Sequence, residues 1–216
     1  MSRVVIIGGH GKIALRLARL LSAEGHEVSS LFRNPEHAEE VASTGAVPVV
    51  ADIENLSAEK IAELVSGHDA VVFSAGAGGG NPDRTYAVDR DAAERSADGA
   101  AAAGVRRFVL VSYFGARTDH GVPPDNSFFH YAEAKAAADA HVRASDLDWT
   151  IVAPSTLTLD PGTGRIETAA QGATSGTVSR DDVAAVIAAV LAQPATIHRT
   201  IQFNNGPTPI DEAITA

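Results

Sequence analysis

The sequence predicts an α/β fold with a doubly wound, mostly parallel sheet of about seven strands and helices on both faces. Two observations indicate it. Short runs of Val, Ile and Phe alternate along the 216 residues with longer, Ala-rich amphipathic segments. The apolar runs are also continuous, which is typical of strands whose two faces are both covered by helices. Such strand–helix alternation favours parallel neighbours joined by crossover helices.

Most of the expected strands are short, continuous runs rich in Val, Ile and Phe. In chain order the strands are Val4–Ile7, Glu27–Phe32, Val47–Val50, Ala70–Phe73, Phe108–Val111, Trp149–Val152 and Thr200–Phe203. These runs together give the predicted strand count.

Capping residues mark the helices between the strands. The first helix is expected over about Lys12–Glu24, with its apolar residues on one face. The second follows Asn34-Pro35, an N-cap residue and a proline at the first helical position. The third is expected to begin at Ser57.

The remaining three helices lie in the second half of the chain. A long Ala-rich run ends near Gly104, which suits a C-cap. The next helix is expected over roughly Ser127–Ala144. The last opens at Ser179-x-x-Asp182, a capping-box pattern, and ends before Pro194.

We expect residues 1–216 to form a single domain, because the chain shows no repeat and no linker. Two stretches, Gly115–Asn126 and Pro154–Val178, break the alternation. Both follow the carboxyl ends of late strands, where ligands bind in open α/β sheets. Residues 154–178, together with 195–216, are expected to form a small substrate lobe over the site.

Composition excludes several classes of partner and site. The net charge is −10 without a basic cluster, so nucleic acid is not an expected partner. No apolar run approaches the roughly 18 residues of a membrane span, and the N-terminal run leads into glycines unlike a signal peptide. The chain has no cysteine, which fits a cytoplasmic protein. Its eight histidines form no metal-binding pair, so no metal is expected.

The stretch Val4–Ala14, "VVIIGGHGKIA", has the pattern of a strand, a glycine-rich turn and a helix start. Gly9-x-Gly11-x-x-Ala14 matches the dinucleotide fingerprint, and Gly8-x-x-Gly11-x-x-Ala14 matches the wider spacing of short-chain dehydrogenases. Bare backbone at a helix start lets a pyrophosphate reach the N–H groups. The motif therefore predicts a bound dinucleotide, and a tight turn without a ligand is the alternative.

Arg33 at the end of the second strand favours NADP over NAD. NAD-binding folds usually place an acid there to hold the ribose 2′-hydroxyl, whereas a guanidinium pairs with a 2′-phosphate. The helix start at Asn34-Pro35 also favours an anion, and Lys12 adds positive charge nearby. A solvated surface arginine is the alternative.

Two further segments are expected beside the cofactor. Asp52 follows the third strand, where its carboxylate would accept from the adenine amino group, or would form an Asx turn before Asn55. Ser74-Ala75-Gly76 follows the fourth strand, and these small residues would let the backbone pass close to the dinucleotide. A flexible Gly-rich loop is the alternative there.

Tyr131 and Lys135 in "YAEAK" are candidate catalytic residues, because i, i+4 spacing on a helix makes them face the same way. A nearby ammonium is expected to lower the pKa of the phenol from its usual value of about 10. Tyr131 would exchange a proton with a substrate oxygen, and Ser112 at the end of the fifth strand would hydrogen-bond that oxygen. Ordinary helix surface residues are the alternative.

The sequence resembles the atypical short-chain dehydrogenases/reductases with NAD(P)H-binding, NmrA-like members. The resemblance runs almost end to end, through "IIGGHGKIA", "SLFRNPEH", "VVADIEN", "AVVFSAG", "VDRDAAERSADGAAAAGVRRFVLVSYFGA", "YAEAKAAAD", "SDLDWTIVAPSTL", "TVSRDDVAAVI" and "IQFNNGPTPIDEAI". It departs from the family at Ala153, which replaces a common arginine, and at Ser155, which replaces a common glycine.

The resemblance implies an NADP-binding Rossmann fold with the site residues placed as above and Pro154 beside the cofactor. Related proteins are described as NAD-dependent epimerase/dehydratase-like or as flavin or biliverdin reductase-like. The residues expected to contact the dinucleotide are Gly8, Gly9, His10, Gly11, Lys12, Ile13, Arg33, Asp52, Ile53, Ser74, Ala75, Gly76, Lys135 and Pro154.

Three functions remain open at this stage. The first is an NADPH-dependent oxidoreductase that transfers hydride to a small carbonyl, quinone or flavin-like substrate. The second is a non-enzymatic NADP-binding sensor, and the third is a nucleotide-sugar epimerase or dehydratase. The Tyr131–Lys135 pair favours an enzyme, and the short C-terminal region disfavours the third function. A homodimer through the Ala-rich helices is left open.

Overall fold

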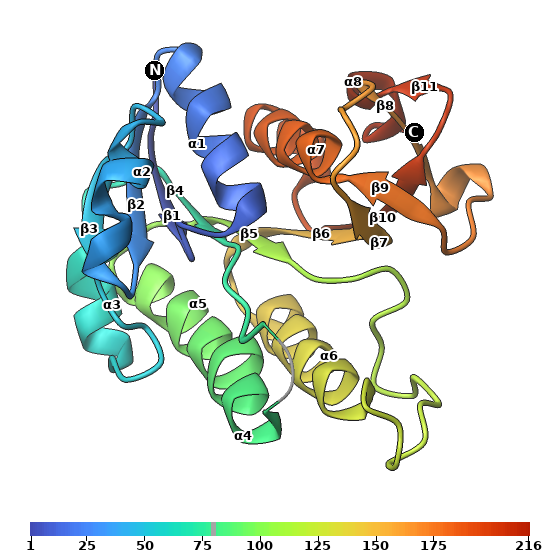
Figure 1. Cartoon of the computed structure of the whole chain (residues 1–216), viewed down its shortest axis with the longest axis horizontal. Coiled ribbons are helices and arrows are strands. Elements are labelled where there is room, and N and C mark those ends of the chain that lie inside the picture. Colours follow the sequence, from blue (N-terminus) through green and yellow to red (C-terminus); the bar gives the residue numbers. More distant parts are fainter. Residues whose placement is uncertain (79–80) are drawn as a thin grey trace.

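The computed structural model describes residues 1–78 and 81–216, and it has the expected architecture of a mostly parallel sheet with helices on both faces (Figure 1). The sheet order is β11-β8-β10-β6-β5-β4-β1-β2-β3. These strands are β1 (Arg3–Ile7), β2 (Glu27–Phe32), β3 (Val47–Val50), β4 (Ala70–Phe73), β5 (Arg107–Val111), β6 (Asp148–Pro154), β8 (Arg165–Thr168), β10 (Arg199–Asn205) and β11 (Thr208–Pro209). All seven expected strands are therefore present and pair in parallel.

The expected strand count of about seven is wrong, because the sheet of the described residues has nine strands. The two additional strands, β8 and β11, are antiparallel to their neighbours. β8 is held by pairing with β10 far along the chain, with Thr168 opposite Phe203. A further two strands, β7 (Thr156–Thr158) and β9 (Thr177–Ser179), form a separate parallel pair.

The main helices lie in two layers. The first layer, α1 (Lys12–Ala23) and α7 (Arg180–Ala192), covers one face of the sheet, and the second, α3 (Ala58–Val65), α5 (Ala93–Ala102) and α6 (Phe129–Ala144), covers the other (Figure 1). Shorter helical elements complete the fold: η1 (Pro35–His37), α2 (Ala38–Ala42), α4 (Pro82–Thr85), η2 (Tyr86–Ala92), η3 (Ala169–Gln171), η4 (Pro194–Thr196) and α8 (Ile210–Ala213).

The sheet divides the apolar core into two clusters. Val4 and Ile6 of β1 belong to the cluster that contains the residues of α1 and α7. Val5 and Ile7 belong to the opposite cluster, with residues of α3, α5 and α6. Because successive side chains of a strand point to opposite faces, both sets must be apolar. This two-sided burial is the reason why the strand sequences are continuous apolar runs.

A continuous helical segment runs from α4 through η2 to α5. Asn81 begins it by accepting the N–H of Arg84 at 3.1 Å. The middle part, η2, is a π-helical turn, an irregularity that is frequent at functional sites. Further along, Gly99 of α5 lies against α3, since a Cβ built on it would be 2.8 Å from the carbonyl oxygen of Ala58.

The contact at Gly99 generates a stability prediction. Glycine to alanine in an exposed helix normally stabilises a protein by about 1 kcal/mol. At position 99 the added methyl must push α5 away from α3, so we expect Gly99→Ala to lower the free energy of unfolding by about 1–3 kcal/mol. Urea denaturation measures the change. A variant that is more stable than the natural protein would show that the two helices do not approach this closely.

Candidate functional site

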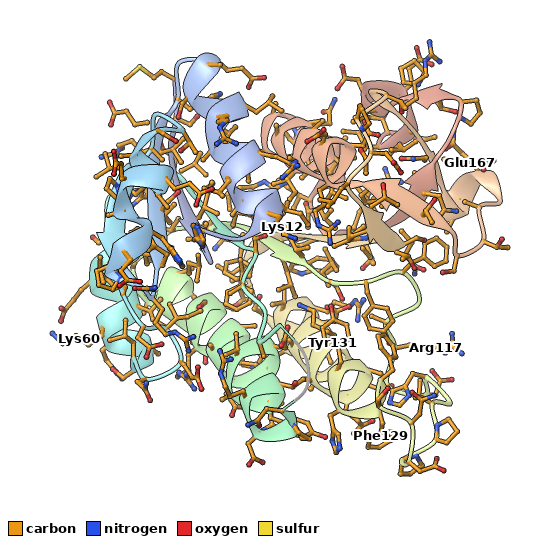
Figure 2. The ribbon with its side chains drawn as sticks, viewed as in Figure 1. Lys12, Lys60, Arg117, Phe129, Tyr131 and Glu167 are labelled. Atoms are coloured by element: carbon orange, nitrogen blue, oxygen red, sulfur yellow. The ribbon has the colours of Figure 1, made fainter. Side chains whose placement is uncertain are left out.

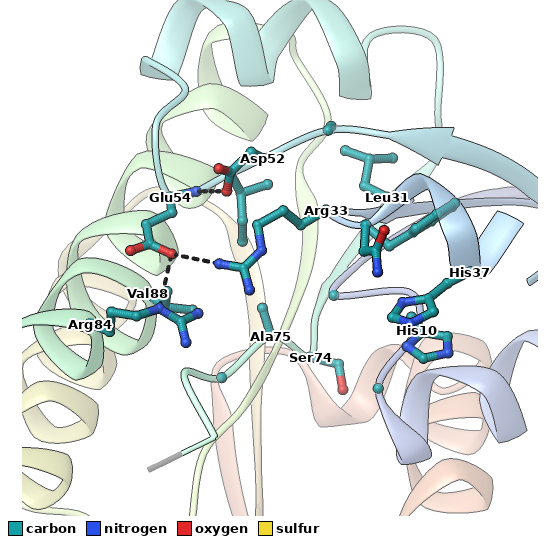
Figure 3. A pocket seen from close by; sticks show the side chains of 17 residues that line it. His10, Leu31, Arg33, His37, Asp52, Glu54, Ser74, Ala75, Arg84 and Val88 are labelled. Carbon is teal, nitrogen blue, oxygen red and sulfur yellow. Dashed lines mark hydrogen bonds and ion pairs between the residues drawn. The ribbon is translucent and has the colours of Figure 1, made fainter. Parts of the chain in front are cut away.

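Three cavities lie where the parallel strands end, and each collects residues from several elements. The Arg33 cavity has a volume of about 280 Å³ and is formed by the β1–α1 turn, the end of β2 and the loops after β3 and β4 (Figure 3). Its expected lining residues are Gly8, His10, Gly11, Arg33, Asp52, Ile53, Ser74, Ala75 and Gly76. The fold therefore brings most of the expected cofactor residues to one place.

The glycines of the β1–α1 turn serve two purposes: two of them allow close packing, and the third leaves the start of α1 open. Gly8 has a φ of +87°, and a Cβ built on it would be 2.6 Å from the backbone of Ala75. A Cβ on Gly9 would be 2.6 Å from that of Ser30. Both glycines are thus required by the packing of the turn against β2 and the β4 loop. Gly11, in contrast, begins α1 without a side-chain cap, which leaves the first N–H groups of the helix for a ligand.

Arg33 faces a carboxylate that sequence reasoning missed. Its Nη1 lies 3.3 Å from Glu54 Oε2, and Nε of Arg84 lies 3.3 Å from the same oxygen (Figure 3). Two guanidinium groups therefore share one carboxylate at the edge of the Arg33 cavity. Glu54 and Arg84 follow β3 and β4, and only the fold makes them neighbours of Arg33.

Two histidines stack at the other end of this cavity. The rings of His10 and His37 have their centroids 3.5 Å apart (Figure 3). His10 Nε2 lies 2.8 Å from Glu40 Oε2, and this hydrogen bond lowers the pKa of the Glu40 carboxyl. His10 was expected in the turn, whereas His37 had no signal in the sequence other than its place after Arg33.

Asp52 forms the Asx turn that was the alternative for it, and it also lies at the Arg33 cavity. Its Oδ1 accepts the N–H of Glu54 at 3.3 Å and its Oδ2 accepts from Asn55 Nδ2 at 2.9 Å, as in an Asx turn. Asp52 also lines the Arg33 cavity. The turn therefore presents the carboxylate to the cavity and does not exclude contact with a ligand.

The Tyr131 cavity, also about 280 Å³, brings the expected catalytic residues together. Tyr131 and Lys135 come from α6, and Ser112 directly follows β5. Ile13, Val111 and Pro154 line the same cavity. Its other wall is Ser74–Gly76, the segment that also lines the Arg33 cavity, so the two cavities are neighbours.

Lys135 is buried, and its ammonium is anchored on the sheet. Nζ donates to the carbonyl oxygen of Val111 at 2.6 Å. Burial lowers the pKa of Lys135, while the carboxyl groups of Asp89 and Asp139 raise it. The buried lysine therefore has two buried acids close enough to affect its pKa. Sequence reasoning found the lysine and missed both acids.

Asp89 is the acid that lines the Tyr131 cavity. It lies on the π-helical turn η2, is 2% exposed, and its Oδ2 accepts the N–H of Ala77 at 3.0 Å. Burial raises the pKa of Asp89, and the charge of Lys135 opposes that rise. The turn thus holds a carboxyl group in the core, directly behind the small-residue loop that follows β4.

The expectation that Lys135 lowers the pKa of Tyr131 is wrong in this structure. Part of the Tyr131 surface is open to the cavities, but its surroundings raise the pKa through burial and then through the charge of Asp89, with smaller effects of Tyr113 and Asp139. Among the described residues no hydrogen bond joins Tyr131 to Lys135, whose ammonium is engaged by Val111. The phenol is therefore held in its protonated form.

Ser112 has an unused hydroxyl. Its N–H donates to Val152 at 2.8 Å, but its buried Oγ has no hydrogen-bond partner in the described part of the chain. Burial raises the pKa of the nearby Asp139 carboxyl, and the charge of Lys135 and the Ser112 hydroxyl oppose that rise, while Asp139 Oδ1 has no hydrogen-bond partner among the described residues. A buried hydroxyl without a partner is costly, so Ser112 is suited to bind a ligand.

Not every expected residue reaches a cavity. Gly9 and Lys12 do not line any of the three, and Lys12 is exposed at the start of α1 (Figure 2). Within the described residues no group of three His, Asp or Glu side chains is placed to hold a metal ion. Across the same residues, no helix combines the length and the apolar character that crossing a membrane requires.

The Phe128 cavity, about 420 Å³, continues from the Tyr131 cavity through their shared residues Ser112, Tyr131, Pro154 and Leu157. Tyr113, Phe114 and Phe128 form its aromatic side. It also contains Ser155, Thr156, Ser175 and Arg180. This cavity is an open space directly beside the candidate catalytic residues.

Comparison with known proteins gives consistent results. A sequence model described as NAD(P)H-binding matches residues 8–194. The chain is 36% identical over 214 residues to "Uncharacterized sugar epimerase YhfK" of Bacillus subtilis, covering 98% of both. It superposes on a "Putative NAD-dependent epimerase/dehydratase" of Bacillus halodurans with a TM-score of 0.90 at 34% sequence identity, and the superposition covers 99% of both chains. The superposition on the oxidoreductase ylbE of Lactococcus lactis has a TM-score of 0.87 at 26% sequence identity, and it covers 98% of this chain and 94% of that one.

The surroundings of Tyr131 predict how the phenol titrates. Because burial and the Asp89 charge raise its pKa, Tyr131 should stay protonated at pH values where an ordinary tyrosine, with a pKa of about 10, ionises. The phenolate absorbance of the natural protein and of Tyr131→Phe should therefore coincide over that range. In Asp89→Asn the two curves should separate at lower pH, whereas Asp119→Asn, in an exposed loop, should change nothing. Loss of part of the signal in Tyr131→Phe at pH 9 to 10 would contradict the assignment.

Proposed function

Because the chain belongs to the NAD(P)H-binding family, we propose that it is an NADPH-dependent oxidoreductase that reduces a carbonyl, quinone or flavin-like substrate. One observation carries the proposal. The Arg33 and Tyr131 cavities share the Ser74–Gly76 segment, so a single extended ligand can reach from Arg33 to the candidate catalytic residues. An extended dinucleotide has the shape that such a pair of cavities requires.

The backbone at the centre of the site fits a dinucleotide. The first N–H groups of α1 have no side-chain cap, no acidic residue lies in the first turn, and Gly11 leaves the helix start open. We place the pyrophosphate there, the adenosine in the Arg33 cavity, and the nicotinamide in the Tyr131 cavity. In a bound complex the dinucleotide would supply the hydride.

We propose that NADPH is preferred over NADH. Arg33 and Arg84 bracket a single carboxylate, that of Glu54, at the edge of the Arg33 cavity, and two guanidinium groups side by side suit a 2′-phosphate. Glu54 opposes this preference, because an acid at that place would repel the phosphate. We give more weight to the two guanidinium groups, since the end of β2 carries Arg33 and no acid.

The residues around Tyr131 suit reduction better than oxidation. A protonated phenol can donate its proton to a substrate oxygen that gains negative charge but cannot accept a proton from a hydroxyl, and the raised pKa of Tyr131 makes it a weak acid in that role. Ser112 Oγ has no partner of its own and would hydrogen-bond the same oxygen. Lys135, fixed by Val111, would hold the cofactor ribose.

A non-enzymatic NADP sensor is the second candidate. The observation that favours it is that Tyr131 has no hydrogen bond to Lys135 among the described residues, so the phenol lacks a direct route for a new proton. An epimerase is suggested by the names of two relatives. We rank it third, because a nucleotide sugar needs a larger substrate lobe than residues 154–178 and 195–216 offer.

The cofactor preference is tested by Arg33→Gln, which removes the charge and keeps a polar side chain of similar reach. We expect the affinity for NADPH to fall about 10- to 100-fold, the usual range for a hydrogen bond to a charged group. The affinity for NADH should change little. Fluorescence titration of both cofactors measures the ratio. Arg106→Gln, an exposed arginine that lines none of the three cavities, is the control. An unchanged ratio would exclude Arg33 as the 2′-phosphate ligand.

Tyr131→Phe separates the enzyme from the sensor. We expect the natural protein to consume NADPH with at least one member of a panel of quinones, flavins and aromatic aldehydes. Tyr131→Phe should bind NADPH with unchanged affinity and lose at least about 100-fold in turnover, as when a general acid is removed. Full activity of the variant would place the proton donor elsewhere. Tight binding of NADPH by the natural protein without turnover on any substrate would favour the sensor.

A further inference from the structure

The Phe128 cavity has one charged lining residue among the described residues, Arg180. The rest of its surface is aromatic, aliphatic or hydroxyl-bearing. The whole chain carries a net charge of −10, so an anion approaching the protein is repelled overall. A single cation in such a cavity is therefore a specific feature of the substrate space.

The aromatic side of the cavity has a defined geometry. The rings of Tyr113 and Phe128 meet edge to face, with centroids 5.2 Å apart and an interplanar angle of 87°. Tyr131 lies 5.6 Å from Tyr113 and 5.3 Å from Phe128. These distances are those of interacting aromatic rings. The side chain of Phe128 is still 41% exposed, so the cluster has aromatic surface left for a ligand.

Arg180 is positioned by two backbone carbonyls. Its Nη1 donates to Leu157 at 3.2 Å and to Thr158 at 2.8 Å, which fixes the guanidinium at the cavity wall. Within the described chain, Nε and Nη2 of Arg180 have no hydrogen-bond acceptor. One edge of the guanidinium is thus held by the protein, and the other edge carries donors without a partner.

The acids next to Arg180 are engaged elsewhere. Asp181 pairs with Arg16 of α1. Asp182 accepts the N–H groups of Thr163 and Gly164, at 2.9 Å and 2.7 Å. Neither carboxylate makes an ion pair with Arg180 among the described residues. The positive charge of the Arg180 guanidinium is therefore not neutralised by these two carboxylates and is available to an anionic ligand in the cavity.

We propose that Arg180 binds a carboxylate of the substrate, and that the substrate is an aromatic carbonyl compound with this carboxylate remote from the reacting oxygen. The inference rests on the proposed function, because Tyr131 and Ser112 define where the reacting oxygen lies. The ring packs on Phe128 and Tyr113, and the carboxylate accepts from the free edge of Arg180. Arginine presents two parallel donors there, which matches the two oxygens of a carboxylate.

The test compares two ligands that differ only in charge. Binding of 2-naphthoate and of 2-naphthamide to the NADP⁺-loaded protein is measured by calorimetry. We expect the acid to bind about 10- to 100-fold more tightly than the amide. In Arg180→Gln the affinity for 2-naphthoate should fall to that for 2-naphthamide. Arg180→Lys should recover part of the difference between the two affinities. The amide should bind both variants as it binds the natural protein.

Arg117→Gln is the matched control, because Arg117 projects outward from the loop after β5 and pairs with Asp119 (Figure 2). It should keep the full preference for the acid. Equal affinities for acid and amide in the natural protein would overturn the proposal, as would an equal loss of both ligands in Arg180→Gln.

The measurement also separates this inference from the proposed function. Binding requires no turnover, so a preference for the acid in a protein that reduces nothing would support Arg180 and contradict the oxidoreductase. Reduction of 4-formylbenzamide and 4-carboxybenzaldehyde with equal kcat/KM would support the oxidoreductase and contradict the role of Arg180. With the role intact, Arg180→Gln should raise KM for the carboxylate about 10-fold or more and leave kcat close to the natural value.

Discussion

The close approach of the β1–α1 turn to the β4 loop is the constraint on which the site depends. Gly8 adopts a φ of +87° and leaves no room for a side chain against Ala75. This contact brings the start of α1 to the carboxyl edge of the sheet. It also places Ser74–Gly76 as the shared wall of the Arg33 and Tyr131 cavities. A larger residue at Gly8 would separate the two halves of the site, whatever the remaining residues are.

Most of the fold follows from the sequence because the physics that shapes it is local. Two-sided burial makes the parallel strands continuous apolar runs, and caps such as Asn34 and Ser179 mark helix starts. β8 and β11 have no such signal. They are short, β8 is held by an antiparallel register against β10, and β11 contains Pro209, which suits an edge strand. Their formation depends on long-range pairing, which no local pattern records.

The candidate site was predictable where a motif carries the chemistry. The glycine turn, Arg33, and the Tyr131–Lys135 spacing led to residues that the fold brings to adjoining cavities. Glu54, Asp89 and Arg180 were missed, because a sequence pattern predicts that an isolated charged residue in a loop or an Ala-rich helix is exposed to solvent. The raised pKa of Tyr131 was missed for the same reason, since its causes, burial and Asp89, appear only when the π-helical turn is packed against α6.

The central claim is that one dinucleotide extends over the start of α1 from Arg33 to Tyr131. A crystal structure of the protein with NADP⁺ tests it most directly. We expect the 2′-phosphate beside Arg33, the pyrophosphate at Gly11, and the nicotinamide ring within about 4 Å of a substrate oxygen site at Tyr131 and Ser112. A dinucleotide that binds with its nicotinamide outside the Tyr131 cavity, or with its pyrophosphate away from the start of α1, would rule out this mode of binding.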